Sequence, residues 1–219
     1  MKKVLKNLLI FISYFIYITL IKGILFVFNI NYYNMDIKYK ILTTILIQIT
    51  YIVFIIILYR KELKEDIKKF KENYKKDIYN YLIIYLLGIL LMGISNIILS
   101  RITNQSVSGN ESMVRIYIDN YPLYMIFSSI IYAPFIEEMI FRKSIRNIFK
   151  NKYLFIIISG LLFGIVHISS INLNELLFSI PYIIMGIDFA YIYYKTNNIF
   201  ITMTFHLCHN LVLLLLYLI

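Results

Sequence analysis

Residues 121–142, YPLYMIFSSIIYAPFIEEMIFR, form an apolar stretch that contains two acids and a base, Glu137, Glu138 and Arg142. A helical crossing of a membrane needs about 20 apolar residues, so the stretch is long enough to span one. Charged side chains in the hydrocarbon core are costly, and those that occur there are usually paired or functional. The stretch therefore predicts a membrane helix that carries part of a functional site.

The spacing of the three charges suggests separate roles for the two acids. On an α-helix, Glu138 and Arg142 share a face because they are four residues apart, whereas Glu137 points about 100° away from Glu138. Arg142 can neutralise Glu138 and leave Glu137 for chemistry. Pro134 removes a backbone hydrogen bond just before the acids, so we expect a kink or water access there. The alternative is a structural ion-pair cluster that holds the helices together.

The composition of the whole chain is that of a membrane protein. Of its 219 residues 60% are hydrophobic, with 7 Gly and 3 Pro, and the mean hydropathy is +0.75. Seven apolar segments can be placed by length, over about residues 8–30, 41–59, 79–100, 121–142, 153–168, 176–194 and 199–219. We predict an all-α polytopic transmembrane bundle of about seven helices, forming a single domain over residues 1–219 whose functional residues lie within 121–219.

Two segments between these crossings are polar. Residues 60–78 are dense in charge, with Leu63, Ile67, Phe70 and Tyr74 at helical spacing. This pattern predicts a cytoplasmic amphipathic helix on the membrane surface, with a solvated charged loop as the alternative. Residues 102–120 show no apolar period and predict a loop.

The distribution of Lys and Arg predicts the orientation in the membrane. With the amino terminus inside, seventeen of the 22 Lys and Arg residues fall in cytoplasmic segments and four on the other side. The amino terminus should be cytoplasmic and the carboxyl terminus outside. The net charge of +10 then points to membrane lipid, not nucleic acid, as the partner. The abundance of Tyr, Ile, Lys and Asn is typical of an AT-rich genome, and we expect a bacterial plasma membrane.

Three further polar residues are candidate partners for the acids. If the fourth and fifth crossings form a hairpin that turns near Asn151, Glu137 and His167 lie at depths that agree within about 3 Å. His206 and Asn210 share one face of the last helix. Residues 160 and 164 are both Gly, which lets another helix approach closely. For His209 we expect an interhelical hydrogen bond, and the single Cys208 excludes an intrachain disulfide.

Taken in order, these residues resemble the CPBP family of intramembrane proteases. The family includes the type II CAAX prenyl endopeptidase and Abi-type bacterial relatives tied to bacteriocin processing and self-immunity. Its three motifs match Glu137, Glu138 and Arg142, then Phe163 and His167, then His206 and Asn210. The residues from Gly186 to Asn198 also look like the family's approach to the third motif. The first 120 residues match only in being apolar helices.

The resemblance implies a peptidase that works without a covalent acyl intermediate. It makes Glu137 and His167 the pair that activates water, and His206 and Asn210 the donors that stabilise the oxyanion. Glu138, Arg142 and Phe163 would be supporting residues, the first two holding Glu137. We therefore expect a cytoplasm-facing site that hydrolyses a small peptide or a membrane-anchored peptide tail and uses no cofactor.

Several alternatives remain open at this point. Glu137, His167 and His206 could bind a catalytic zinc ion, although no His-Glu-x-x-His helix is present. The chain could be a non-catalytic immunity or scaffold protein, or a proton-coupled carrier, although no inverted repeat is visible. Asp188 could line the same cavity or pair with Lys22. The sequence leaves the oligomeric state open.

Overall fold

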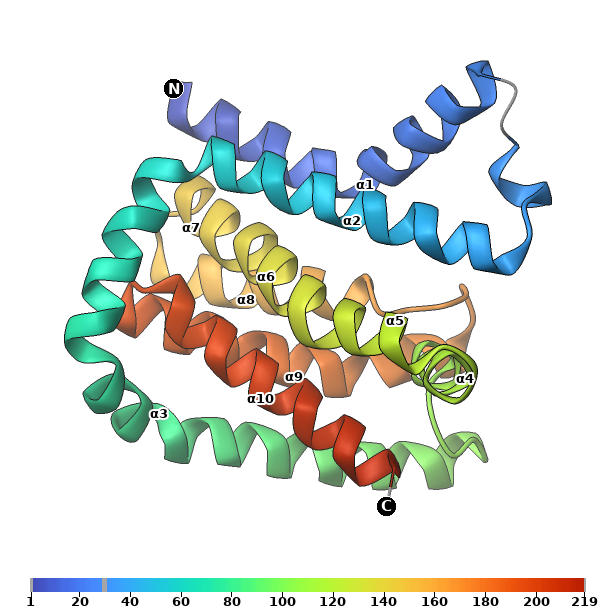
Figure 1. Cartoon of the computed structure of the whole chain (residues 1–219). Helices are drawn as coiled ribbons and strands as arrows, with labels where there is room; N and C mark the ends of the chain where they lie inside the picture. Colours follow the sequence, from blue (N-terminus) through green and yellow to red (C-terminus); the bar gives the residue numbers. More distant parts are fainter. Residues whose placement is uncertain (1, 29–30, 219) are drawn as a thin grey trace.

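A computed structural model describes residues 2–28 and 31–218, and these residues form an all-helical bundle without strands. This confirms the predicted polytopic all-α fold. The predicted limits of the first crossing at residue 30, of the last at 219 and of the domain at 1 and 219 lie outside the described residues. Within them, six helices are long and apolar enough to cross a membrane (Figure 1): α1 (Lys2–Val27), α2 (Ile37–Leu58), α3 (Arg60–Thr103), the helix Pro122–Ile148, α9 (Leu173–Thr196) and α10 (Ile199–Leu218).

The predicted fifth crossing is shorter than expected. Helix α8 (Lys152–Ile165) has 14 residues, and at 1.5 Å per residue it is about 21 Å long, less than the roughly 30 Å of a hydrocarbon core. The chain leaves the helix at Val166 and reaches α9 through residues 167–172, four of which are polar. The expectation of a full-length helix over 153–168 is therefore wrong, and His167 lies beyond the helix end.

Helix α3 joins the charged segment and the third crossing into one helix of 44 residues. Its first part runs across one end of the bundle, and the helix then turns along the bundle (Figure 1). Residues 60–78 are thus helical and not a loop. Leu63 packs in the main hydrophobic core and Phe70 against a second core cluster, whereas Ile67 and Tyr74 are exposed.

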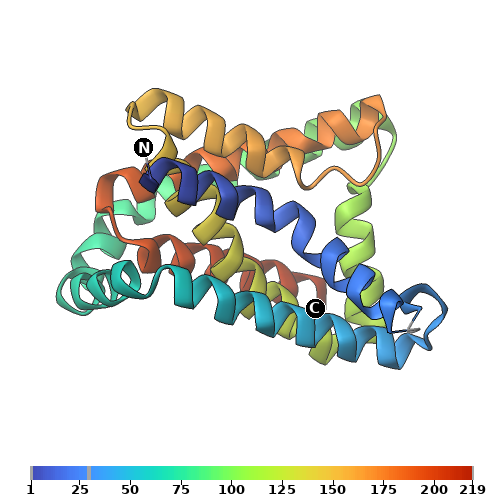
Figure 2. The ribbon, with the colours of Figure 1, turned by 90° about the horizontal axis from the view of Figure 1, so that it is seen from above.

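The segment predicted as a loop contains a helix, α4 (Gly109–Asn120). Its N-cap Ser108 accepts a hydrogen bond of 3.1 Å from the backbone N–H of Glu111. Ser-x-x-Glu is the capping-box pattern, a signal that the search for apolar periodicity did not use. Two views show α4 lying across the direction of the long helices, at the end opposite the start of α3 (Figures 1 and 2).

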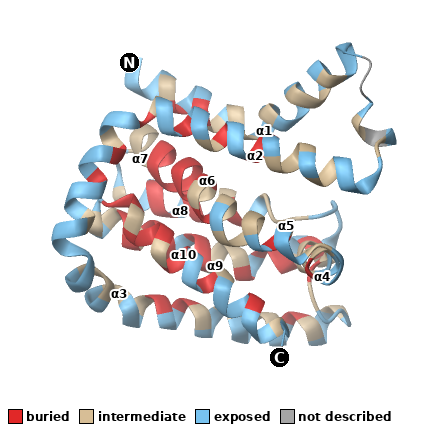
Figure 3. Ribbon diagram, viewed as in Figure 1, coloured by how far each residue is buried: buried red, intermediate tan, exposed pale blue. Residues whose placement is uncertain are grey.

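The central helix changes its winding along its length. It consists of α5 (Pro122–Ile126), the π-helical turn η2 (Phe127–Tyr132), α6 (Ala133–Glu137), the π-helical turn η3 (Glu138–Ser144) and α7 (Ile145–Ile148). Such wide turns are rare in proteins, and those that occur are often found at functional sites. All seven residues of η3 are buried (Figure 3). Arg142 and Lys143 therefore lie inside the bundle and do not protrude from it, and Lys143 forms an ion pair with Asp66 of α3.

Helices α8 and α9 pack closely through small residues. A Cβ atom added to Gly160 would lie 3.0 Å from the backbone nitrogen of Ile187, and one added to Gly186 would lie 2.9 Å from the carbonyl oxygen of Gly160. Both distances are shorter than ordinary contacts, so each glycine allows its helix to approach. The close approach predicted for the Gly160 and Gly164 face is confirmed, and its partner is α9.

We predict that Gly160→Ala destabilises the folded protein by about 1–3 kcal/mol, because the added methyl group overpacks a rigid helix contact. Gly93→Ala is the matched control, since nothing lies within 4 Å of a Cβ atom at that position and helices favour Ala over Gly. Thermal unfolding of the detergent-purified variants measures both effects. Equal midpoints for the two variants would contradict the proposed helix contact.

Candidate active site

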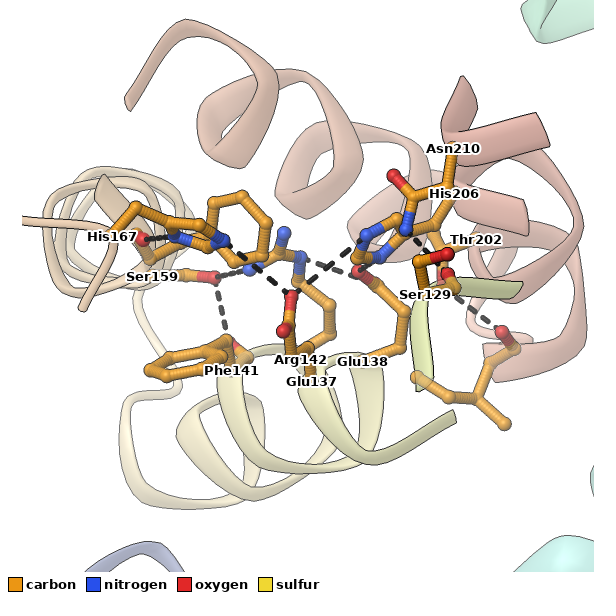
Figure 4. Close-up of polar contacts among 12 residues, drawn as sticks. Ser129, Glu137, Glu138, Phe141, Arg142, Ser159, His167, Thr202, His206 and Asn210 are labelled. Atoms are coloured by element: carbon orange, nitrogen blue, oxygen red, sulfur yellow. Dashed lines mark hydrogen bonds and ion pairs between the residues drawn. The ribbon is translucent and has the colours of Figure 1, made fainter. Parts of the chain in front are cut away.

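The residues of the three sequence motifs meet in the interior of the bundle (Figure 4). Glu137 and Glu138 come from the central helix, His167 from the segment after α8, and His206 and Asn210 from α10. Glu137 Oε2 lies 4.0 Å from His167 Nε2 and 3.8 Å from His206 Nε2. Both imidazole rings therefore face the same carboxylate, as the depths in the sequence predict for Glu137 and His167.

The end of α8 orients His167. The last carbonyl groups of a helix have no partner within it, and the carbonyl oxygen of Phe163 accepts a hydrogen bond of 2.7 Å from His167 Nδ1. A carbonyl can only accept, so Nδ1 carries the proton. In the neutral ring Nε2 then has a free lone pair directed toward Glu137. This orientation depends on the helix ending before His167.

Glu138 is a bridge between the central helix and α10. Its Oε1 accepts a hydrogen bond of 3.0 Å from His206 Nδ1, and its Oε2 lies 3.2 Å from Arg142 Nε in an ion pair between side chains with no exposed surface. The expectation that Glu138 and Arg142 hold Glu137 differs from this geometry, because the partner that Glu138 holds is His206. The spacing prediction that Arg142 pairs with Glu138 agrees with the observed ion pair.

Arg142 is surrounded on several sides. Its Nη1 donates a hydrogen bond of 3.2 Å to Ser159 Oγ, and Ser159 Oγ donates one of 2.6 Å to the carbonyl oxygen of Phe141. The guanidinium carbon lies 4.5 Å from the ring centroid of Phe163 and 5.7 Å from that of Phe189. Phe163 thus supports Arg142 through a cation–π contact. Ser159 and Phe189 were not identified from the sequence, because neither belongs to a motif.

Pro134 determines where Asn210 points. In η2 the hydrogen bonds run from residue i+5 to residue i, and the backbone N–H of Ala133 bonds to the carbonyl oxygen of Ser128. The next such bond would need an N–H on residue 134, which proline lacks. The carbonyl oxygen of Ser129 instead accepts a hydrogen bond of 2.7 Å from Asn210 Nδ2. The carbonyl group that Pro134 leaves free therefore anchors a side chain of α10.

Tyr182 of α9 holds His167 from the side. The two rings are stacked, with centroids 4.3 Å apart and planes at 13°. The Tyr182 hydroxyl lies 3.2 Å from Ser108 Oγ and accepts a hydrogen bond of 3.2 Å from Asn110 Nδ2. One side chain thus connects the imidazole to the beginning of α4. No sequence signal distinguishes Tyr182 from the other 20 tyrosines.

A cavity of about 290 Å³ borders Glu137, His167, His206 and Asn210 and extends to α4. This is close to the lower limit of small-molecule sites, about 300 Å³. The residues that line it come from α3, α4, the central helix, the end of α8, α9 and α10: Met92, Asn110, Glu111, Val114, Ile118, Met125, Ser128, Ser129, Ala133, Glu137, Phe163, His167, Tyr182, Met185, Phe189, His206, His209, Asn210, Leu213, Leu214 and Tyr217.

The remaining polar residues lie apart from the Glu137 cluster or contribute only to the cavity wall. Asp188 is absent from the lining of this cavity and borders a second, apolar pocket of about 540 Å³. The described residues show no ion pair between Asp188 and Lys22, whose Nζ lies 4.3 Å from the ring centroid of Tyr32. His209 lines the cavity and meets Phe189 edge-on at 6.4 Å, and no hydrogen bond to another helix is present within the described part of the chain. Cys208 is exposed.

The three alternative zinc ligands, Glu137, His167 and His206, converge, but across residues 2–28 and 31–218 no group of three or more His, Cys, Asp or Glu side chains is arranged as a metal site.

Comparisons with known proteins find similarity to membrane peptidases. Residues 119–212 match the family described as Rce1-like, type II CAAX prenyl endopeptidase Rce1-like. A protein of Bacillus subtilis (strain 168) named "Putative membrane peptidase YdiL" is 38% identical over 106 residues, which cover 47% of this chain and 41% of that protein. The chain thus spans less than half the length of this relative. No solved structure matches the present chain. Both matches agree with the resemblance to the CPBP intramembrane proteases, and the range matched by the family contains all three motifs.

We predict that Arg142→Met destabilises the protein by about 3–5 kcal/mol, because it leaves the buried Glu138 carboxylate without its cation. The double variant Arg142→Met with Glu138→Gln should recover much of this loss, since it removes the unpaired charge. Arg115→Met is a matched control: Arg115 forms a partly exposed pair with Glu111 at the same spacing, and the expected loss is below about 1 kcal/mol. Thermal unfolding in detergent measures all three. A double variant as unstable as the single one would contradict the charge-pair explanation.

Proposed function

We propose that the chain is an intramembrane endopeptidase that hydrolyses a peptide bond with a water molecule activated by Glu137 and His167. The observation that carries the proposal is the Glu137 carboxylate, which faces the Nε2 atoms of two histidines at 4.0 and 3.8 Å beside a cavity within an apolar helical bundle. The membrane-peptidase family of residues 119–212 supports the same reaction class.

The positions of the acceptors suit water activation. Glu137 Oε2 and His167 Nε2 are both acceptors, since His167 donates through Nδ1 to Phe163. Two acceptors 4.0 Å apart cannot bond to each other, but both can accept from one water oxygen at ordinary hydrogen-bond distances of about 2.7–2.9 Å. The water would lose its proton to this pair as it attacks the scissile carbonyl. Positioned general bases of this kind contribute about 10²–10⁴-fold in rate.

On the other side of Glu137, His206 and Asn210 are the proposed oxyanion donors. The Nδ1–H of His206 is bonded to Glu138, so Nε2 donates when the ring is an imidazolium. Asn210 uses one Nδ2 hydrogen for Ser129 and keeps the other. Both donors border the cavity. Donors that are held in place before the reaction stabilise developing charge without reorganisation.

We propose a short peptide or a membrane-anchored peptide tail as the substrate, and no metal. The enzyme would be an integral protein of the plasma membrane of a bacterium. The binding-only function, an immunity or scaffold protein, makes a different prediction, because it needs no hydrolysis. The two are separated by the activity of the Glu137 variant.

We predict that Glu137→Gln lowers the peptidase rate of the lipid-reconstituted full chain by about 10²–10⁴-fold, because an amide cannot accept a proton from water. Glu72→Gln is the control, since Glu72 is exposed on α3. Cleavage of quenched-fluorescence peptides measures the rate, with and without a chelator. Loss of the wild-type rate in chelator and recovery with zinc would replace this mechanism by the metal alternative. Equal rates for wild type and Glu137→Gln would contradict the catalytic role.

For the oxyanion donors, we predict that Asn210→Ala lowers kcat by about 10²–10³-fold and leaves KM within a few fold, because the lost hydrogen bond forms only in the transition state. Cys208→Ser is a matched control on the same helix, two residues away and exposed. Steady-state kinetics on one peptide measures both constants. An increase in KM at constant kcat would assign Asn210 to substrate binding instead.

A further inference from the structure

The two ends of the bundle differ in charge. Fifteen of the 22 Lys and Arg residues gather at one end, in the start of α1, the first part of α3, the turn from α7 to α8, and the turn from α9 to α10 (Figures 1 and 2). The other end carries four, at the start of α2, near the end of α3 and in α4. Basic segments of membrane proteins remain in the cytoplasm, so the end at α4 is the non-cytoplasmic one.

The basic end is closed by packed side chains. Beyond Glu137 toward that end, Ile140 and Phe141 have no exposed surface, and Ile145 is 2% exposed. The buried ion pair between Lys143 and Asp66 lies in the same region and joins the central helix to α3. A peptide approaching from the cytoplasm would have to displace these buried side chains, and protein cores are close-packed.

The cavity is bordered at the other end by α4 and the last turns of α10. Asn110 and Val114 of α4 and Leu213 and Tyr217 of α10 line it, and these residues lie toward the end with few basic residues. Helix α4 is fastened there, because the backbone N–H of Gly109 donates a hydrogen bond of 2.8 Å to Glu175 of α9. The cavity therefore extends from Glu137 toward the end opposite the basic segments. This conflicts with the cytoplasm-facing site expected from the sequence.

The lining of the cavity describes what can enter it. Its apolar part contains Ile118, Leu213 and Leu214 and three of the eight methionines, Met92, Met125 and Met185, whereas Asn110 and Glu111 of α4 add polar groups at the other end. Methionine side chains adapt to differently shaped apolar groups. Near α4 the acid Glu111 is paired with Arg115 at 2.9 Å. The apolar part of the lining therefore favours apolar side chains, and the acid at the α4 end already has a partner.

We infer that the substrate is a peptide segment with apolar residues beside the scissile bond, and that it enters from the non-cytoplasmic face of the membrane. This inference rests on the proposed peptidase function, whose substrate it specifies. It combines two independent features of the chain, the placement of the basic segments and the position of the cavity. The reaction would then act on peptides that have already been exported or that are displayed on the outer surface.

The orientation and the side of cavity access can be tested without any peptidase activity. In a Cys208→Ser background, Lys69→Cys marks the basic end and Gln105→Cys the opposite end; both positions are exposed. Ser129→Cys places a thiol in the cavity wall. A charged, membrane-impermeant thiol reagent applied to intact cells should label Gln105→Cys and Ser129→Cys. Lys69→Cys should react only after permeabilisation.

The side of cleavage is tested with membrane vesicles of defined orientation. Right-side-out and inverted vesicles receive the same impermeant quenched-fluorescence peptide, and Glu137→Gln vesicles supply the background. We expect cleavage in right-side-out vesicles and a rate at least about tenfold lower in inverted ones. Replacing the apolar residues beside the scissile bond by Asp should lower the rate by at least about tenfold, because burying an unpaired charge is costly.

The outcomes separate the inference from the function on which it rests. Labelling of Ser129→Cys only after permeabilisation, or faster cleavage in inverted vesicles, would overturn the inferred side while leaving hydrolysis established. Equal cleavage of the apolar and Asp-substituted peptides would overturn the apolar specificity. Absence of cleavage in both vesicle types, with Ser129→Cys labelled from outside, would overturn the peptidase function and with it the substrate, although the cavity would still open outward.

Discussion

The buried carboxylate of Glu138 is the interaction on which the site depends. It accepts a hydrogen bond from His206 of α10 and pairs with Arg142 of the central helix, and neither carboxylate nor guanidinium has exposed surface. Removing such ions from water costs several kcal/mol each, so they are tolerated only when nearly all their contacts are made within the protein. Ser159 of α8 completes the set through its bond to Arg142. Three helices must therefore be in register before the charges are compensated, and this register also brings His206 to Glu137.

Departures from regular α-helix produce the geometry around this pair. The wide turn η2 and Pro134 together free a carbonyl group, which Asn210 uses. The early end of α8 frees another, which orients His167. In a membrane an unsatisfied backbone group is expensive, so such irregularities persist only where side chains satisfy the freed groups. In this bundle the side chains that do so belong to the second and third motifs.

The side of the membrane from which we infer access to the site differs from the side expected from the sequence. The basic segments predict which end is cytoplasmic, and the family resemblance led us to expect a site that faces that end. In the structure Arg142 and Lys143 are buried, and the core around Phe141 closes the basic end. Distance along a helix measures depth but does not indicate which end of the bundle is filled. That depends on side chains from α1, α2, α3 and α8, which are remote in sequence.

The sequence alone determined the class of fold, the helix that carries the charges and the residues of the three motifs, because hydropathy, charge and four-residue spacing are local properties of a helix. It also indicated that Glu137 and His167 lie at one level. Only the tertiary structure decided that Glu138 holds His206, that Tyr182 stacks on His167, that Ser129 fixes Asn210, and that the cavity leads toward α4. Each of these joins elements whose separation in sequence carries no periodic signal, so it depends on how the helices pack and not on what each helix contains.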